Sequence, residues 1–111
     1  MLECSFLIPT RRDAEISDGK MHGKKPWRWL RDSLLQTVGD YTLAPGEYEG
    51  TFTPEPGKQM RDESRRFIVA LDKRRLPQLR ALLRRACVVF EQRCIYLSVA
   101  GHVELVYGPN N

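Results

Sequence analysis

The last third of the chain changes from helical to strand periodicity, and this change limits the choice of fold more than any other feature. Apolar side chains first recur three and four positions apart, as on one face of a helix: Leu76, Leu79, Leu82, Leu83, Ala86, Cys87 and Phe90. Apolar side chains then alternate, as in a half-buried strand: Ile95, Leu97, Val99, Val103, Leu105 and Tyr107. We therefore predict a helix over 78–90, with Pro77 in its first turn, and strand structure over 94–107.

The apolar residues on both sides of Gly101 all have odd numbers, and this limits the kind of turn that can form there. A two-residue turn at Ala100 and Gly101 would pair odd with even positions and direct His102 and Glu104 towards the core. A three-residue loop over 100–102 would keep the odd-numbered apolar residues together, and so would one long strand with a bulge at Gly101. We favour these two arrangements over the tight turn, and the choice between them stays open.

The rest of the chain supplies four more elements. Alternation predicts a strand over 2–8, a polar loop follows at about 10–25, and helical spacing from Pro26 predicts a helix to about Val38. A short strand over 47–53 should end at the two prolines of 54–57, and a more buried strand should cover 65–71. The order matches the split βαβ pattern. We predict one α+β domain over 1–111 with a ferredoxin-like fold, two helices covering one face of a mainly antiparallel sheet.

One segment also carries a family resemblance. The run Phe90-Glu91-Gln92-Arg93-Cys94-Ile95-Tyr96-Leu97, continued by Gly101-His102-Val103-Glu104-Leu105, resembles the helix-to-strand tail of small bacterial α+β proteins of unknown function. The resemblance implies the same fold and no catalytic residues.

Composition narrows the setting of the protein. Its 111 residues suit one domain, and no stretch approaches the roughly 18 apolar residues of a membrane span. Cys4, Cys87 and Cys94 form an odd set without metal-ligand spacing, which is typical of a reducing cytoplasm. We expect a cytoplasmic protein with no membrane segment, no metal and no cofactor.

Positive charge gathers in two places, and the net charge is +4. The first group lies near the first predicted helix and includes a tryptophan that falls off its apolar stripe: Lys24, Lys25, Arg28, Trp29 and Arg31. The second group precedes and lines the second predicted helix: Lys73, Arg74, Arg75, Arg84 and Arg85. An exposed indole among cations can stack on a base or anchor a protein. Solvated helix faces, with the indole packed under a loop, would explain the same residues.

We therefore predict a non-enzymatic interaction or regulatory module that binds an acidic protein or a nucleic acid through these ten residues. Two helices leave one sheet face uncovered, which favours a homodimer.

The alternative is a small enzyme or toxin-like effector with its active site on the C-terminal strands or the 10–25 loop. Ser98, His102 and Glu104 could form a nucleophile-base cluster on one sheet face, although an ordinary polar face fits the same residues. Four carboxylates could act as acid-base pairs or simply keep strand edges soluble: Glu47, Glu49, Asp62 and Glu63. Cys4 and Cys87 fall on apolar stripes, so Cys94 is the cysteine to test for reactivity. We assign no catalytic residue.

Overall fold

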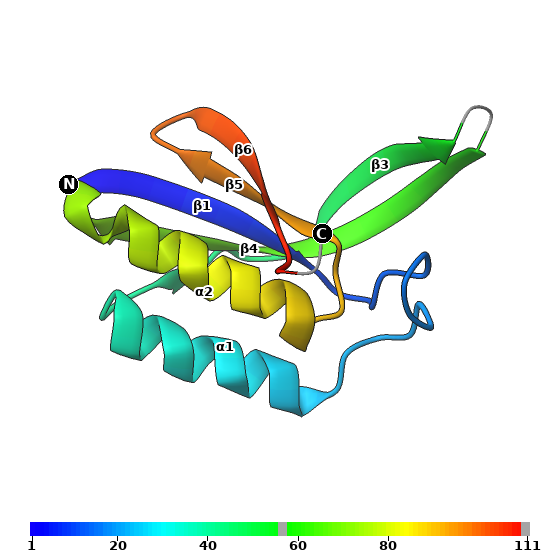
Figure 1. The fold of residues 1–111 in the computed structure, drawn as a ribbon, viewed down its shortest axis with the longest axis horizontal. Helices are drawn as coiled ribbons and strands as arrows, with labels where there is room; N and C mark the ends of the chain where they lie inside the picture. The colour runs from blue at the N-terminus through cyan, green and yellow to red at the C-terminus, as the bar shows by residue number, and fades with distance from the viewer. Residues whose placement is uncertain (56–57, 110–111) are drawn as a thin grey trace.

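The structure is a computed structural model that describes residues 1–55 and 58–109. Within these residues it is an α+β fold in which two helices lie on one face of a six-stranded sheet (Figure 1). The elements in chain order are β1 (Leu2–Pro9), α1 (Lys24–Thr37), β2 (Thr42–Leu43), β3 (Tyr48–Glu55), β4 (Lys58–Leu71), the 3₁₀ helix η1 (Lys73–Arg75), α2 (Leu76–Val89), β5 (Cys94–Val99) and β6 (His102–Tyr107).

The sheet is antiparallel in every described pairing. Its strand order is β2-β4-β1-β5-β6, and β3 pairs with β4 beyond the end of β1. The central strand β1 joins both halves of the chain, with Phe6 opposite Phe67 on β4 and opposite Leu97 on β5. This arrangement confirms the predicted α+β class and the mainly antiparallel sheet.

The core lies between the sheet and the helix layer. Three even-numbered residues of β1 are fully buried, Cys4, Phe6 and Ile8. The predicted stripe of α2 meets them, with Leu79, Leu82, Leu83, Ala86 and Phe90 fully buried. Fully burying one such side chain contributes about 1.5–3 kcal/mol. The stripe therefore fixes which side of α2 faces the sheet.

The helix α1 packs with a narrower apolar face than predicted. Leu30 and Leu34 are fully buried, whereas Leu35 is 48% exposed. The helix starts at Lys24, two residues before Pro26, which keeps the proline in the first turn. It runs antiparallel to α2, so the start of α1 lies beside the end of α2 (Figure 1).

Two strands are longer than the sequence predicts. β3 continues through Pro54 to Glu55, although we expected it to end at Pro54. It pairs with β4 alone, and an edge strand tolerates a proline because one side of its backbone is unpaired. β4 begins at Lys58 rather than at 65, and the short β2 has no counterpart in the prediction. The predicted turn at 56–57 lies outside the described residues.

The turn after β5 contradicts the arrangements we favoured. Val99 lies opposite His102, so Ala100 and Gly101 form a two-residue turn. Their φ angles are 49° and 87°, the left-handed conformation of a type I′ turn, whose twist matches that of the strands. His102 and Glu104 therefore face the helix side. Three apolar residues lie on the open sheet face, about half exposed: Val103, Leu105 and Tyr107.

Candidate functional site

The nine basic residues predicted to bind a partner are all exposed, but they do not converge. Lys24 and Lys25 begin α1, whereas η1 lies at the other end of the helix pair (Figure 1). There the Nη1 of Arg75 donates to the carbonyl of Thr37, 3.4 Å away, at the end of α1. Lys73, Arg74 and Arg75 therefore lie at the opposite end of the helix layer from Lys24 and Lys25. Arg84 and Arg85 lie between them, in the second half of α2. Whether they bind a partner stays a prediction.

Trp29 is partly buried and packs against the core, which favours the packed indole over the freely exposed one. Whether Trp29 contacts a partner stays a prediction. Residue 29 lies off the apolar stripe of the helix, but its indole is large enough to contact the edge of the core. Trp27 is also partly buried, as its place on the stripe suggests, and the Arg65 guanidinium lies 4.2 Å from its ring centre.

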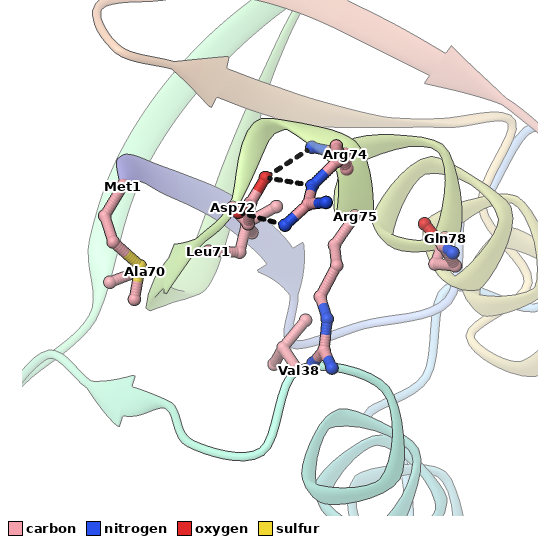
Figure 2. A pocket seen from close by; sticks show the side chains of 8 residues that line it. All are labelled: Met1, Val38, Ala70, Leu71, Asp72, Arg74, Arg75 and Gln78. Atoms are coloured by element: carbon pink, nitrogen blue, oxygen red, sulfur yellow. Dashed lines mark hydrogen bonds and ion pairs between the residues drawn. The ribbon is translucent and has the colours of Figure 1, made fainter.

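A groove opens where η1 meets the end of α1 (Figure 2). Its volume is about 560 Å³, within the range of small-molecule sites. The lining mixes apolar and charged side chains: Met1, Val38, Ala70, Leu71, Asp72, Arg74, Arg75 and Gln78. The Asp72 carboxylate is already engaged, since it accepts hydrogen bonds from the Arg74 backbone (2.9 Å) and from the Arg74 guanidinium (3.2 Å). These bonds lower the pKa of Asp72.

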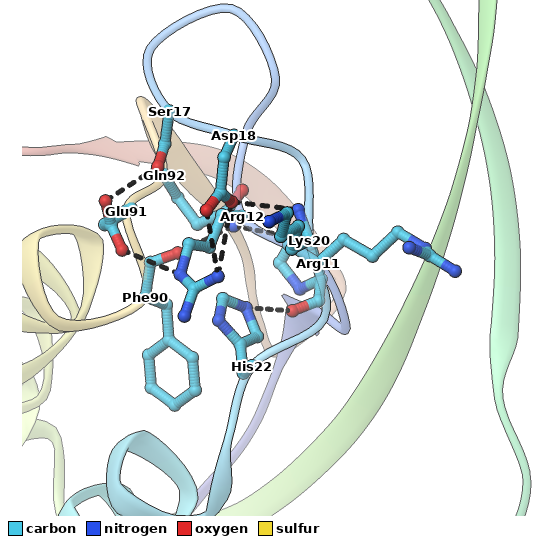
Figure 3. Close-up of polar contacts among 10 residues, drawn as sticks. Arg11, Arg12, Ser17, Asp18, Lys20, His22, Phe90, Glu91 and Gln92 are labelled. Atoms are coloured by element: carbon cyan, nitrogen blue, oxygen red, sulfur yellow. Dashed lines mark hydrogen bonds and ion pairs between the residues drawn. The ribbon is translucent and has the colours of Figure 1, made fainter.

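The 10–25 loop is tied to the end of α2 by polar contacts (Figure 3). Arg12 pairs with Glu91 at 2.9 Å and with Asp18 at 3.2 Å. The Ser17 hydroxyl donates to Glu91 at 2.7 Å, and the Gln92 amide donates to the Arg11 carbonyl at 2.7 Å. The loop is therefore bonded to the C-terminal half of the fold.

His22 anchors the same loop from within. Its Nε2 donates to the Pro9 carbonyl at 2.9 Å (Figure 3). Its ring meets Trp27 and Phe90 edge-on. Burial lowers the pKa of His22, against the smaller opposing effect of the bond to Pro9. The imidazole is thus a neutral donor engaged with the backbone, which argues for a structural role.

Asp62 on β4 interacts electrostatically with two other carboxylates, Asp13 after β1 and its neighbour Glu63. Burial raises the pKa of Asp62, and the negative charges of Asp13 and Glu63 add to the effect. Asp13 itself accepts a hydrogen bond from Arg93 at 2.7 Å. We refer to Asp13, Asp62, Glu63 and Arg93 as the Asp62 cluster. A carboxylate that burial and like charges hold towards its neutral form is a typical feature of binding and catalytic sites.

Asp62 belongs to the open face of the sheet. Strand alternation places Asp62, Ser64 and Arg66 on the face away from the helices, because Phe67, Val69 and Leu71 face the core. Tyr48 on β3 lies opposite Ser64, and the Arg66 guanidinium lies 5.9 Å from the Tyr48 ring centre. The open face thus carries the aromatic side chain of Tyr48 opposite a position two residues from Asp62.

The nucleophile-base cluster considered for the last strands does not form. Ser98 lies opposite Val103 on the open face, while Glu104 lies on the helix side and pairs with Arg80 at 2.7 and 3.1 Å. Because of the two-residue turn, Ser98 and the pair His102 and Glu104 lie on opposite faces of the sheet.

The thiols are not activated either. Burial raises the pKa of Cys94 and raises that of Cys87 to about 11. Cys4 and Cys87 are buried, as predicted. Among the described residues, no three His, Cys, Asp or Glu side chains are grouped to hold a metal ion. No helix in the described part of the chain is long and apolar enough to cross a membrane.

Comparison with known proteins places the fold. No protein-family model and no curated protein matches the chain. Phage SAM lyase in complex with S-methyl-5'-thioadenosine matches with a TM-score of 0.67 and 13% identity, over 96% of this chain and 89% of that one. Phage SAM lyase in its apo state matches with a TM-score of 0.63 and 12% identity, over 97% and 90%. The chain is therefore similar to phage SAM lyase in its fold.

Proposed function

We propose that this chain is a small enzyme that binds S-adenosylmethionine and releases S-methyl-5'-thioadenosine. The observation that carries the proposal is the extent of the fold similarity, which spans 96% of this chain and 89% of the ligand-bound lyase. The shared region is thus nearly a whole small protein rather than a common motif. Because one fold can serve many functions, the chemistry of the chain's own residues must support the activity as well.

The Asp62 cluster suits the charge of this substrate. S-adenosylmethionine is a sulfonium cation, which carboxylates and aromatic faces both attract. Asp62 and Tyr48 place these two groups on the open sheet face. We infer that the Asp62 carboxylate faces the sulfonium. A cation there would offset the burial and the like charges that raise the pKa of Asp62, so binding should favour its ionised form.

The proposed reaction needs little acid-base catalysis from the protein. When the bond between the sulfonium sulfur and the four-carbon amino acid breaks, its electron pair goes to sulfur, and the leaving thioether is neutral. No proton donor is needed for that step. The four-carbon fragment closes on its own carboxylate or loses a proton to a base. The site must therefore mainly hold the cation in place, and the step requires no activated thiol.

The substitution Asp62→Asn tests both the function and the site. S-adenosylmethionine is charged and S-methyl-5'-thioadenosine is neutral, so loss of the carboxylate should weaken binding of the first by about tenfold and leave the second within about twofold. Titration calorimetry with each ligand measures this, and chromatography detects released thioether. Asp40→Asn, at an exposed position, is the matched control.

Two outcomes would contradict different parts of the proposal. If the folded parent binds neither ligand and releases no thioether, the function is wrong. If Asp62→Asn weakens both ligands equally or neither, the function can stand but the assigned contact is wrong.

The interaction module is the second candidate, because all nine predicted basic side chains are exposed. In that role the chain binds an acidic protein or a nucleic acid through these exposed side chains of its helix layer. A homodimer would then cover the open sheet face, where Tyr96, Leu105 and Tyr107 are 39–50% exposed.

We also propose a ferredoxin-like topology and a cytoplasmic location. The central order β5-β1-β4 with β2 outside is the order expected of the split βαβ pattern, extended by β3 and β6. The three cysteines are free thiols, as expected in a reducing compartment.

A further inference from the structure

The outer edge of β6 is open. β6 ends the sheet order, and no described strand pairs with its outer side. Val99 lies opposite His102 across the turn, and the Gly108 N–H donates to the Arg93 carbonyl at 3.2 Å. Even-numbered residues of β6 therefore bond to β5, and the N–H and C=O groups of Val103, Leu105 and Tyr107 point outwards.

This edge lacks the usual protections against strand pairing. Residues 102–107 contain no proline, no lysine and no bulge against β5. The one carboxylate of the strand, Glu104, is engaged by Arg80. The outward-bonding residues Val103, Leu105 and Tyr107 also carry apolar side chains that are 49–56% exposed. Both the backbone and the open face of β6 are thus available to an added strand.

A positively charged groove runs along the helix side of the same edge. It has a volume of about 400 Å³, and its lining includes Arg80, Arg84 and Glu104. Arg80 and Glu104 neutralise each other through their two bonds. Arg84 is exposed, and among the described residues it has no ion-pair partner. The groove therefore carries one unpaired positive charge.

We propose that the β6 edge binds an extended peptide segment of alternating acidic and apolar residues, which adds to the sheet as a further strand. The peptide backbone pairs with Val103, Leu105 and Tyr107. Because side chains of a strand alternate between faces, one set lies in the groove and the other on the open face. Acidic side chains in the groove meet Arg84, and apolar side chains on the open face meet Leu105 and its neighbours.

Charge favours such a peptide over a second copy of the chain. Two copies can pair their outward groups about a two-fold axis at Leu105, which keeps the helices of both copies on the same side of the joined sheet. The two grooves would then meet. Since each Arg80 is neutralised by Glu104, the two unpaired Arg84 side chains would approach each other, and like charges oppose association.

Anisotropy titration of the labelled peptide Glu-Val-Glu-Val-Glu-Val tests the proposal, with Lys-Val-Lys-Val-Lys-Val as the charge control. The parent should bind the acidic peptide and not the basic one. Arg84→Glu should weaken binding at least about tenfold, whereas Arg85→Glu, exposed one residue further along α2 and outside the groove lining, should change it less than about twofold. Leu105→Pro should abolish binding, because it removes an outward N–H and no bond to β5. Circular dichroism and melting confirm that each variant is folded.

Hydrogen exchange distinguishes strand addition from other contacts. Addition of the acidic peptide should slow exchange at the amides of Val103, Leu105 and Tyr107. Equal binding of the two peptides, no effect of Arg84→Glu, or no slowed exchange overturns the proposal. These amides could also exchange slowly in the protein without peptide, and that protection could disappear when the protein is diluted. Such a result would show that a second copy of the chain occupies the edge, and it would also overturn the proposal.

Discussion

At the scale of single residues, His22 connects three parts of the fold. It bonds to the end of β1 through Pro9, and its ring contacts Trp27 of α1 and Phe90 at the end of α2. The sequence shows only an isolated histidine in a polar loop. Its role depends on a residue as distant in the chain as Phe90, so local pattern could not reveal it.

The lowered pKa of His22 predicts a pH-dependent stability. The unfolded imidazole has a pKa of about 6.5 and the folded one a lower value, so in that window the unfolded chain binds more protons. The contribution of His22 should be complete above pH of about 6.5 and should fall as the pH drops through the folded pKa. Denaturant melts between roughly pH 5 and 7 should show a smaller pH slope for His22→Gln, which keeps a donor for Pro9. An identical slope in both proteins would contradict the assignment, since Asp62 and the other groups titrate in both.

At the scale of elements, the β5–β6 hairpin shows what alternation can and cannot predict. It predicts strands correctly, but it does not say which face is the core, because apolar residues occupy both. Val106 is buried, yet its apolar neighbours Leu105 and Tyr107 are about half exposed. The two-residue type I′ turn determines that the even-numbered residues of β6 face the helices. Alanine is an unusual residue at the first position of such a turn. The sequence therefore favoured the wrong loop.

The same turn yields a stability prediction. Ala100 has a φ of 49°, which asparagine adopts more readily than alanine, so Ala100→Asn should stabilise the fold by about 0.5–1 kcal/mol. Gly101→Ala should destabilise it by about 1–2 kcal/mol, because the φ of 87° disfavours a Cβ. Urea melts of both variants measure these changes in the free energy of unfolding. A loss of stability in Ala100→Asn would argue for a different turn.

Other elements were predicted to different degrees. The stripe of α2 and the strand β1 follow from periodicity and match the structure closely. The extent of β3 and β4 could not be predicted, because prolines usually end strands and only the edge position of β3 permits Pro54. The sequence marks Asp62 as a candidate carboxylate, but its burial and the nearby Asp13 depend on packing between segments distant in sequence. The bond between Arg80 and Glu104 likewise depends on the hairpin register.

At the scale of the whole molecule, charge is distributed along the helix layer rather than concentrated. If the second candidate function holds, the groups at its two ends should contribute independently to nucleic-acid binding. We consider two triple variants in which glutamine replaces Lys24, Lys25 and Arg28, or Lys73, Arg74 and Arg75. Each variant should weaken binding and flatten its salt dependence. The slope of log binding constant against log salt concentration should fall by about 0.7 for every phosphate of a single strand that is no longer neutralised. Anisotropy with a single-stranded oligonucleotide at low and physiological salt measures both effects. Unchanged binding in both triple variants would exclude electrostatic recruitment at these sites.

The position of β1 at the centre of the sheet has a consequence for biosynthesis. Cys4 pairs with Val69 on one side and with Val99 on the other, so the earliest strand of the fold needs partners made much later. At a synthesis rate of about 5–20 residues per second, β1 waits for β5 for roughly 5 to 20 s. During that time the β5 side of β1 stays unpaired, and Phe6 and Ile8, fully buried in the finished protein, lack that half of the sheet. A nascent chain stalled before β5 should therefore remain open to proteases and chaperones, and the fold should close only as β5 leaves the ribosome.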